Sequence, residues 1–219
     1  MKAQIAAGAF TDPEWVGRYA VTFAGLYRKA ITAYDDGPST DVPKAWRLGF
    51  DAGRAGTTLV LQDMLLGINA HVNNDLPFAL DAISIGPDRE QRYRDHAAVN
   101  AVLGSVVERA TQRLAALYAP GFPSLDEYAG QLDEILSAFS LQIARESAWE
   151  GAVSLANARN PTERRLVTTL IGSRAAVIAR LLLAPSRNAP AIAACRRIEA
   201  GPQWLTLLAD LHHTLCPTQ

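Results

Sequence analysis

The chain has 219 residues and a formal net charge of −1, from 21 basic and 22 acidic side chains. This length allows one domain to bury a sizeable core, and 49% hydrophobic with 20% charged residues excludes a disordered protein. The balanced charge creates no field that would attract nucleic acid, so no nucleic-acid partner is expected. We predict one helical domain over 1–219, with residues 1–12 as a leader whose flexibility is left open.

The sequence favours a cytoplasmic location. The first ten residues lack the strongly apolar centre of a signal peptide, and no stretch approaches about 18 uninterrupted apolar residues. Cys195 and Cys216 are not in a Cys-x-x-Cys pattern, which favours free buried thiols over a disulfide. We therefore expect a soluble protein without a membrane span, and we leave a homodimer open as its oligomeric state.

Helical periodicity and helix start signals recur along the chain, and no convincing strand appears. Pro13 suits the first turn of a helix that runs to about Tyr34 and carries an aromatic stripe, interpreted as core. Residues 53–58 are expected as a turn, with Thr57 or Thr58 capping the next helix. The other helices are expected at 44–52, 58–74, 88–118, 124–157 and 160–184, with two short ones over 188–215. We predict an all-α bundle of about six to eight helices with long central antiparallel helices.

The run from Gln62 to Leu80 has the pattern of a long apolar helix, yet it carries a cluster of polar residues. These are Asn69, His71, Asn73, Asn74 and Asp75. Buried polar groups cost free energy unless each finds a partner. Pro77 predicts a kink or break near Asn73, because proline removes a backbone hydrogen bond and clashes with the carbonyl four residues earlier. Alternatively, Asn74 or Asp75 caps a new helix with Pro77 in its first turn.

The same region carries a resemblance to a known family. Its residues are Leu66-Gly67-Ile68-Asn69-Ala70-His71, then Asn73 and Asp75-Leu76, preceded by Trp46-Arg47. This motif resembles an uncharacterised, mainly actinobacterial family of helical proteins, known only as a domain of unknown function. The resemblance runs from about residue 43 to residue 183. It implies an all-helical domain with a polar centre around His71 and Asp75, and it implies no activity.

A weaker similarity is to the zinc-dependent phospholipase C and P1 nuclease group. Helices of that group carry His-x-x-x-Asp ligand pairs like His71 and Asp75. The similarity implies a metal-dependent hydrolase. The other histidine pairs of that group, and its metal-binding amino terminus, are absent from this chain.

The spacing of the polar residues predicts one site between helices. His71 and Asp75, four residues apart, can present two metal ligands, or an imidazole and the carboxylate that orients it. If the next helix is antiparallel about Gly86, His96 lies at a depth similar to that of Asp75. The predicted catalytic residues are His71, Asp75, His96 and Glu146, with His71, Asp75 and His96 also as candidate metal ligands. The predicted substrate-binding residues are Asn69, Asn73, Asn100, Arg145 and Trp149.

This residue set is compatible with three kinds of function. A zinc, iron or manganese ion could activate water against an ester or phosphoester, with Glu146 as general base if it is not a ligand. Without a metal, His71 oriented by Asp75 could act as acid or base on a small apolar molecule, as in a cyclase, isomerase or dehydratase. In the third reading the network only fixes helix register in a ligand- or partner-binding module. We favour a small-molecule enzyme.

Overall fold

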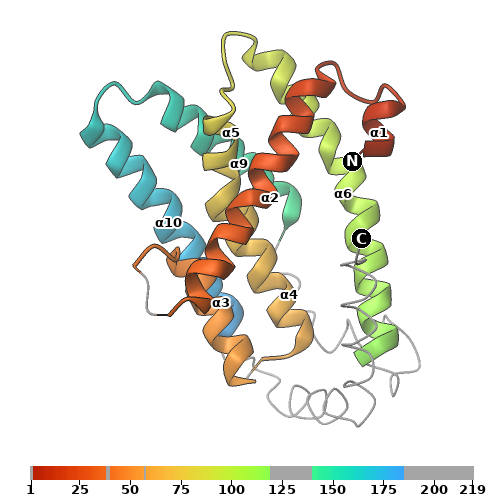
Figure 1. Ribbon diagram of the computed structural model, residues 1–219, viewed down its shortest axis with the longest axis vertical. Helices are drawn as coiled ribbons and strands as arrows, with labels where there is room; N and C mark the ends of the chain where they lie inside the picture. The colour runs from red at the N-terminus through yellow and green to blue at the C-terminus, as the bar shows by residue number, and fades with distance from the viewer. Residues whose placement is uncertain (1, 38–39, 57, 119–139, 185–219) are drawn as a thin grey trace.

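The computed structural model describes residues 2–37, 40–56, 58–118 and 140–184 (Figure 1). The described chain is all-α, as predicted, and contains no strand in those ranges. Its helices are α1 (Lys2–Ala6), α2 (Pro13–Asp35), α3 (Lys44–Ala55), α4 (Val60–Asn69), the π-helix η1 (Ala70–Asp75), α5 (Leu76–Ala82), α6 (Arg89–Tyr118), α9 (Leu141–Asn157) and α10 (Pro161–Leu183).

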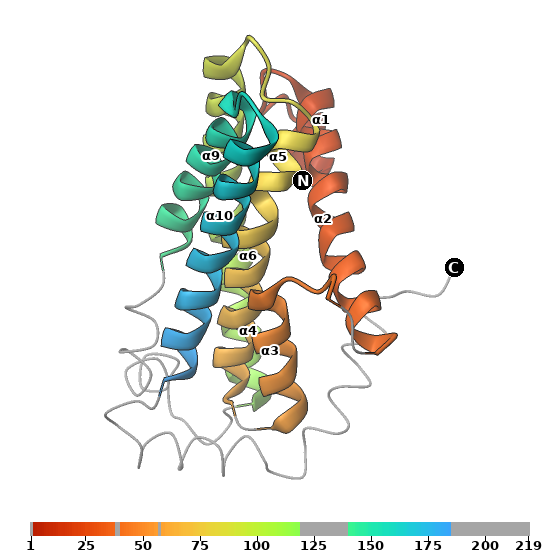
Figure 2. The same ribbon diagram turned by 90° about the vertical axis from the view of Figure 1, so that its left-hand side faces the viewer.

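The helices surround one central element. We call α4, η1 and α5 together the central rod, because residues 60–82 run without a break through the middle of the molecule (Figures 1 and 2). The long helices α2, α3, α6, α9 and α10 all contact this rod. The chain reverses direction between α5 and α6, so α6 runs antiparallel to the rod, as the sequence predicted (Figure 1).

A side-chain hydrogen bond caps the start of α2, α9 and α10. The Asp12 side chain accepts a hydrogen bond from the Trp15 backbone N–H at 2.8 Å, with Pro13 in the first turn of α2. The Asn160 side chain accepts from the Glu163 backbone N–H at 2.9 Å and opens α10. Such caps satisfy amides that have no partner inside the helix. Residues from the expected leader also take part in the fold, since α1 precedes α2 and Phe10 is buried.

The turn predicted for residues 53–58 is wrong in its first half. Helix α3 continues to Ala55, and Gly56 ends it in the left-handed conformation at φ 61°, which glycine adopts without the steric cost of a side chain. The predicted threonine cap is also not formed. The N-cap of α4 is Leu59, whose N–H donates to Gln62 Oε1 at 3.0 Å. Thr58 donates to Asp63 instead, and Thr57 lies outside the described residues.

The disturbance predicted before Pro77 takes the form of a π-helix. The backbone N–H of Leu76 donates to the carbonyl of His71, five residues earlier. A wider turn relieves the clash that Pro77 would make with the carbonyl four residues before it. The alternative is correct in part: α5 begins at Leu76, with Asp75 at its N-cap position and Pro77 in its first turn. It is wrong in the cap itself, because Asp75 has helical angles of φ −81° and ψ −36° and its side chain makes no capping hydrogen bond.

The single helix predicted over 124–157 is also wrong. Ser140 is extended at φ −115° and ψ 115°, and its side chain accepts from the backbone N–H of Ile143 at 3.4 Å. Helix α9 therefore begins at Leu141. The start signal predicted at 124–127 and the two short helices predicted over 188–215 lie outside the described residues, as do Cys195 and Cys216.

Apolar side chains pack against the rod in several clusters. The largest joins α2, η1, α5, α6 and α9, and includes Trp15, Val16, Tyr19, Val72, Leu76, Leu80, Val99, Ala148, Trp149 and Ala152. A second joins α3, α4 and α10 through Ala52, Leu61, Leu65, Leu66, Ala179 and Leu182. A third surrounds Trp46, with Ala30, Val42, Ala45, Ala70 and Ala175. The aromatic stripe of α2 is therefore core at Trp15 and Tyr19, as predicted, but Tyr27 of the same stripe is 39% exposed.

Helix α10 carries apolar residues on both sides. One side is buried through Ile171, Ala175, Ala176, Ala179 and Leu182. The other exposes Leu166, Leu170, Val177 and Leu181. Within the described residues, α10 is long and apolar enough to cross a membrane by length and composition, a criterion that core helices of soluble proteins also meet.

Candidate functional site

The polar cluster of the rod is centred on a histidine–aspartate pair. Nδ1 of His71 lies 3.0 Å from Oδ2 of Asp75. Because a carboxylate only accepts hydrogen bonds, Nδ1 is the donor in this bond, and Nε2 is the ring nitrogen that Asp75 does not engage. Nε2 has no hydrogen-bond partner among the described residues. The predicted pairing of these two residues is therefore present, with one ring nitrogen unused.

The carboxylate of Asp75 is fixed from three directions. Asp75 is 3% exposed. Besides the contact with His71, Trp46 Nε1 donates a hydrogen bond to Oδ2 at 2.8 Å, and Asn74 Nδ2 donates one to Oδ1 at 2.9 Å. Donors on both oxygens hold the carboxylate in one orientation. Trp46 comes from α3, so two elements hold the partner of His71 in place.

Aromatic rings enclose the His71 imidazole. Phe23 of α2 stacks on it with ring centroids 3.6 Å apart and planes 7° apart. Trp46 and Tyr27 lie at 5.9 and 6.1 Å. The side chain keeps 23% of its surface exposed. The ring is thus held in a fixed orientation but remains accessible.

The asparagines of the cluster connect the rod to α10. Asn73 Nδ2 donates to Asn69 Oδ1 at 3.0 Å, and Asn69 Nδ2 donates to the Ala175 carbonyl at 2.9 Å. Both residues are buried. Asn69 and Asn73, predicted to bind substrate, therefore form hydrogen bonds with neighbouring protein groups.

A cavity of about 480 Å³ opens between α2, α3 and α4. His71 is not among its lining residues, but Tyr27 and Trp46 line the cavity and both contact the His71 ring, so the ring lies next to that lining. The full lining is Tyr27, Ile31, Tyr34, Asp35, Trp46, Gly49, Phe50, Gly53, Arg54, Asp63 and Gly67. This volume is typical of small-molecule sites.

Glycines keep the cavity open. Gly49 and Gly53 lie one turn apart on α3, and Gly67 lies on α4. A Cβ added at Gly67 would meet no atom within 4 Å. Glycine costs stability inside a helix, roughly 1 kcal/mol relative to alanine. A larger side chain at Gly67 would project into free space without a backbone clash.

Three charged residues, Asp35, Arg54 and Asp63, belong to the lining of the cavity. Arg54 pairs with Asp35 at 3.3 Å and lies over the Tyr34 ring at 4.6 Å from its centroid. Burial raises the pKa of Asp63, although the hydrogen bond from the Thr58 hydroxyl opposes that rise. The Tyr34 hydroxyl donates to Asp51 at 2.7 Å, and this bond raises the tyrosine pKa.

A second polar cluster surrounds His96. Arg145, 1% exposed, donates to the Tyr19 hydroxyl at 3.0 Å, to the His96 carbonyl at 2.7 Å and to Asn100 Oδ1. Burial, and then the charge of Arg145, lower the pKa of His96 to about 3. His96 is therefore neutral at physiological pH. Arg145 and Asn100, predicted as substrate-binding residues, bind each other here.

The second cluster also contains Trp149. The centroid of its ring lies 5.3 Å from that of the His96 ring and 5.3 Å from that of the Tyr93 ring. Glu146, the predicted base, is exposed, and the Tyr93 hydroxyl donates to its carboxylate, 2.9 Å from Oε2 and 3.0 Å from Oε1. Adjacent helical residues point about 100° apart, so burying Arg145 turns Glu146 outward.

The structure therefore separates the predicted catalytic set into different places. His71 and Asp75 are together, whereas two aromatic rings lie between His71 and His96. Phe23 stacks on the His71 ring, the Tyr19 ring lies 6.2 Å from that of Phe23, and the His96 ring lies 6.0 Å from that of Tyr19, measured between centroids. Aromatic rings of α2 thus connect the two histidines. In the described part of the chain, no three His, Cys, Asp or Glu side chains are grouped so that they could hold a metal ion. The candidate ligands His71, Asp75 and His96 do not form one set.

Several site residues escaped the sequence analysis. Trp46 appeared only in the family motif, and Tyr27 was only one of the aromatic residues of the helix expected from Pro13 to about Tyr34, which were interpreted as core. The glycines at 49, 53 and 67 carried a usable signal, since Gly49 and Gly53 share one face of a helix.

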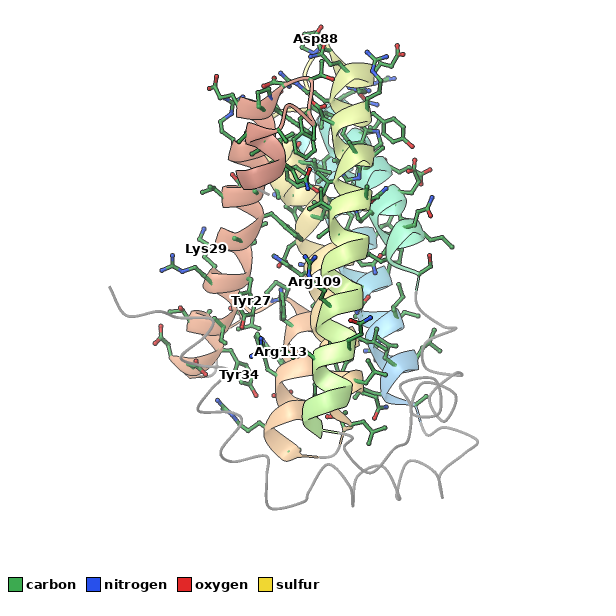
Figure 3. The ribbon with its side chains drawn as sticks, turned by 90° about the vertical axis from the view of Figure 1, so that its right-hand side faces the viewer. Tyr27, Lys29, Tyr34, Asp88, Arg109 and Arg113 are labelled. Atoms are coloured by element: carbon green, nitrogen blue, oxygen red, sulfur yellow. The ribbon has the colours of Figure 1, made fainter. Side chains whose placement is uncertain are left out.

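In Figure 3, Tyr27 and Tyr34 lie on α2, Lys29 points away from the bundle, and Arg109 and Arg113 extend from α6.

Comparisons with known proteins support a family assignment only. The model of a family of unknown function, DUF5995, matches residues 1–185. No curated protein and no solved structure matches.

Proposed function

The chain belongs to that family of unknown function, and we propose from its site that it is a small-molecule enzyme in which His71, held by Asp75, transfers a proton. Its substrate is a small, mostly apolar molecule that enters the cavity between α2, α3 and α4. The observation that carries the proposal is the unused Nε2 of His71, on a ring fixed by a buried carboxylate beside an open cavity.

The chemistry follows from the pair. Nε2 can accept a proton from the substrate or from water, and the Asp75 carboxylate stabilises the imidazolium that results. In an isomerisation, the same proton returns to another atom of the substrate. In an ester hydrolysis, water loses its proton to Nε2 and attacks the carbonyl carbon, the bond to the leaving oxygen breaks, and that oxygen receives the proton.

Two features support a functional rather than a purely structural pair. A network that only fixes helix register gains from full hydrogen bonding and close packing, yet Nε2 is unpaired among the described residues and the neighbouring cavity is kept open by glycines. The pair also spans a π-helix, a rare element that is frequent at functional sites.

Hydrolysis of 4-nitrophenyl acetate, a small ester, tests the proposal. We expect His71→Gln to lower the rate at least about tenfold, since a positioned acid or base contributes two or more orders of magnitude in a native reaction. Gly67→Leu should lower it similarly by filling the cavity. Release of 4-nitrophenolate is followed by absorbance, and circular dichroism verifies that each variant is folded.

Gly25→Leu is the matched control. It makes the same change in α2, where no atom lies within 4 Å of the new Cβ, away from the cavity. Its rate should equal that of the wild type. Equal rates for wild type and His71→Gln in folded protein would refute the proposed role of His71.

A further inference from the structure

We propose that the cavity takes an organic cation, a protonated or quaternary amine, as the charged end of its ligand. This inference rests on the proposed function, because it names the class of molecule for the same cavity. It is carried by the aromatic lining together with a carboxylate that has no cationic partner among the described residues.

The cavity has a continuous aromatic wall. Tyr27 contacts Trp46 with centroids 5.2 Å apart, Trp46 contacts Phe50 at 5.1 Å, and Phe50 contacts Tyr34 at 4.9 Å. All four rings line the cavity. The faces of such rings attract cations through their quadrupoles, most strongly where water is excluded. Arg54 already uses this property by lying over Tyr34.

The charges in the lining favour a cation. Arg54 is the one cation among the lining residues, and it is paired with Asp35. Asp63 then remains as an acidic group without an ion pair in the described chain. Arg109 and Arg113 extend from α6 on the side where Tyr27 and Tyr34 lie (Figure 3), but they are not among the lining residues. A ligand cation would supply the missing partner.

Glycine leaves Asp63 accessible. A Cβ added at Gly53 would lie 3.8 Å from Asp63 Oδ1, so the glycine leaves room beside this carboxylate. Burial raises the pKa of Asp63, and a nearby bound cation would favour its ionised form. An ammonium head can therefore sit between the aromatic wall and Asp63.

Three probes of nearly equal shape test this proposal by isothermal titration calorimetry. Choline is the cation, 3,3-dimethyl-1-butanol its neutral isostere, and 3,3-dimethylbutanoate the anion. We expect choline to bind at least about tenfold more tightly than the alcohol, a ratio that cation–ring attraction and one carboxylate can supply. The alcohol should bind more tightly than the anion. A neutral or anionic probe that binds as tightly as choline would overturn the proposal.

Substitutions locate the binding. Asp63→Asn should weaken choline binding about tenfold and leave alcohol binding unchanged. Asp88→Asn removes the same charge at the opposite end of the bundle (Figure 3) and should change neither. Gly67→Leu should abolish binding of both probes. Unchanged choline affinity in folded Asp63→Asn would overturn the inference.

The same titrations separate this inference from the proposed function. If the alcohol binds, Gly67→Leu removes that binding, and choline binds no more tightly, the cavity functions as a small-molecule site and only the cation inference fails. If none of the three probes binds, both fail.

Discussion

At the scale of single residues, the structure resolves the polar cluster into two independent groups. Asp75 fixes His71 on one side of the α2 aromatic rings, and Arg145 fixes His96 on the other. Their environments differ. His71 keeps an accessible ring, whereas His96 is 1% exposed and has the Arg145 guanidinium as a neighbour. The first histidine is suited to chemistry and the second to structure.

The lowered pKa of His96 predicts a pH dependence of stability. Its pKa is about 3 in the folded protein against a usual 6.5, so the unfolded chain binds the proton first as pH falls. Stability is therefore lost as pH drops from about 6.5 toward 3, by about 1.4 kcal/mol per unit. Between pH 6 and 4, wild type should lose about 2–3 kcal/mol more than His96→Gln.

Urea unfolding at each pH measures this difference. The acidic side chains titrate in both proteins, so their contribution cancels in the comparison. Parallel stability curves for wild type and His96→Gln would show that His96 does not carry the effect.

The residue pattern predicted the His71–Asp75 pair because a spacing of four places two side chains together on a helix. It did not predict that His96 and Glu146 lie elsewhere. Depth along a helix follows from residue counting, but the direction of a side chain depends on which neighbour is buried. Arg145 took the interior position, and Glu146 was turned to the surface.

At the scale of elements, α9 packs against the rod where η1 passes into α5. Gly151 lets α9 approach Pro77 of α5 and Ile171 of α10, because a Cβ there would lie 3.3 Å from Pro77 Cβ and 3.4 Å from Ile171 Cδ1. Pro77 predicted a disturbance in the sequence. The π register itself could not be predicted, since a kink would have relieved the same clash.

Gly151→Val tests this packing. We expect it to destabilise the protein by about 1–3 kcal/mol, because a larger side chain overpacks the contact with Pro77. Gly25→Val makes the same change where no atom lies within 4 Å. Chemical denaturation gives both free energies of unfolding. Equal stability of the two variants would argue against a close contact at Gly151.

At the scale of the whole molecule, the helices pack closely around the rod but leave a cavity between α2, α3 and α4. The all-α fold and most helix starts could be predicted from periodicity and capping residues, as at Pro13 and Asn160. The cavity could not, because it results from the meeting of three separate helices, two of which, α3 and α4, carry glycines in its lining. His71 is not itself a lining residue, but Tyr27 and Trp46 line the cavity and contact its ring, which places the histidine–aspartate pair behind these two side chains.

The most direct measurement is the rate at which diethyl pyrocarbonate modifies each histidine, mapped by peptide mass spectrometry on native protein. This small electrophile reacts with an accessible, unprotonated ring nitrogen. We predict that His71 reacts quickly, that buried His96 is protected, and that Gly67→Leu slows the reaction at His71 while Gly25→Leu does not. A His71 that reacts no faster than His96 would contradict an available Nε2 beside the cavity.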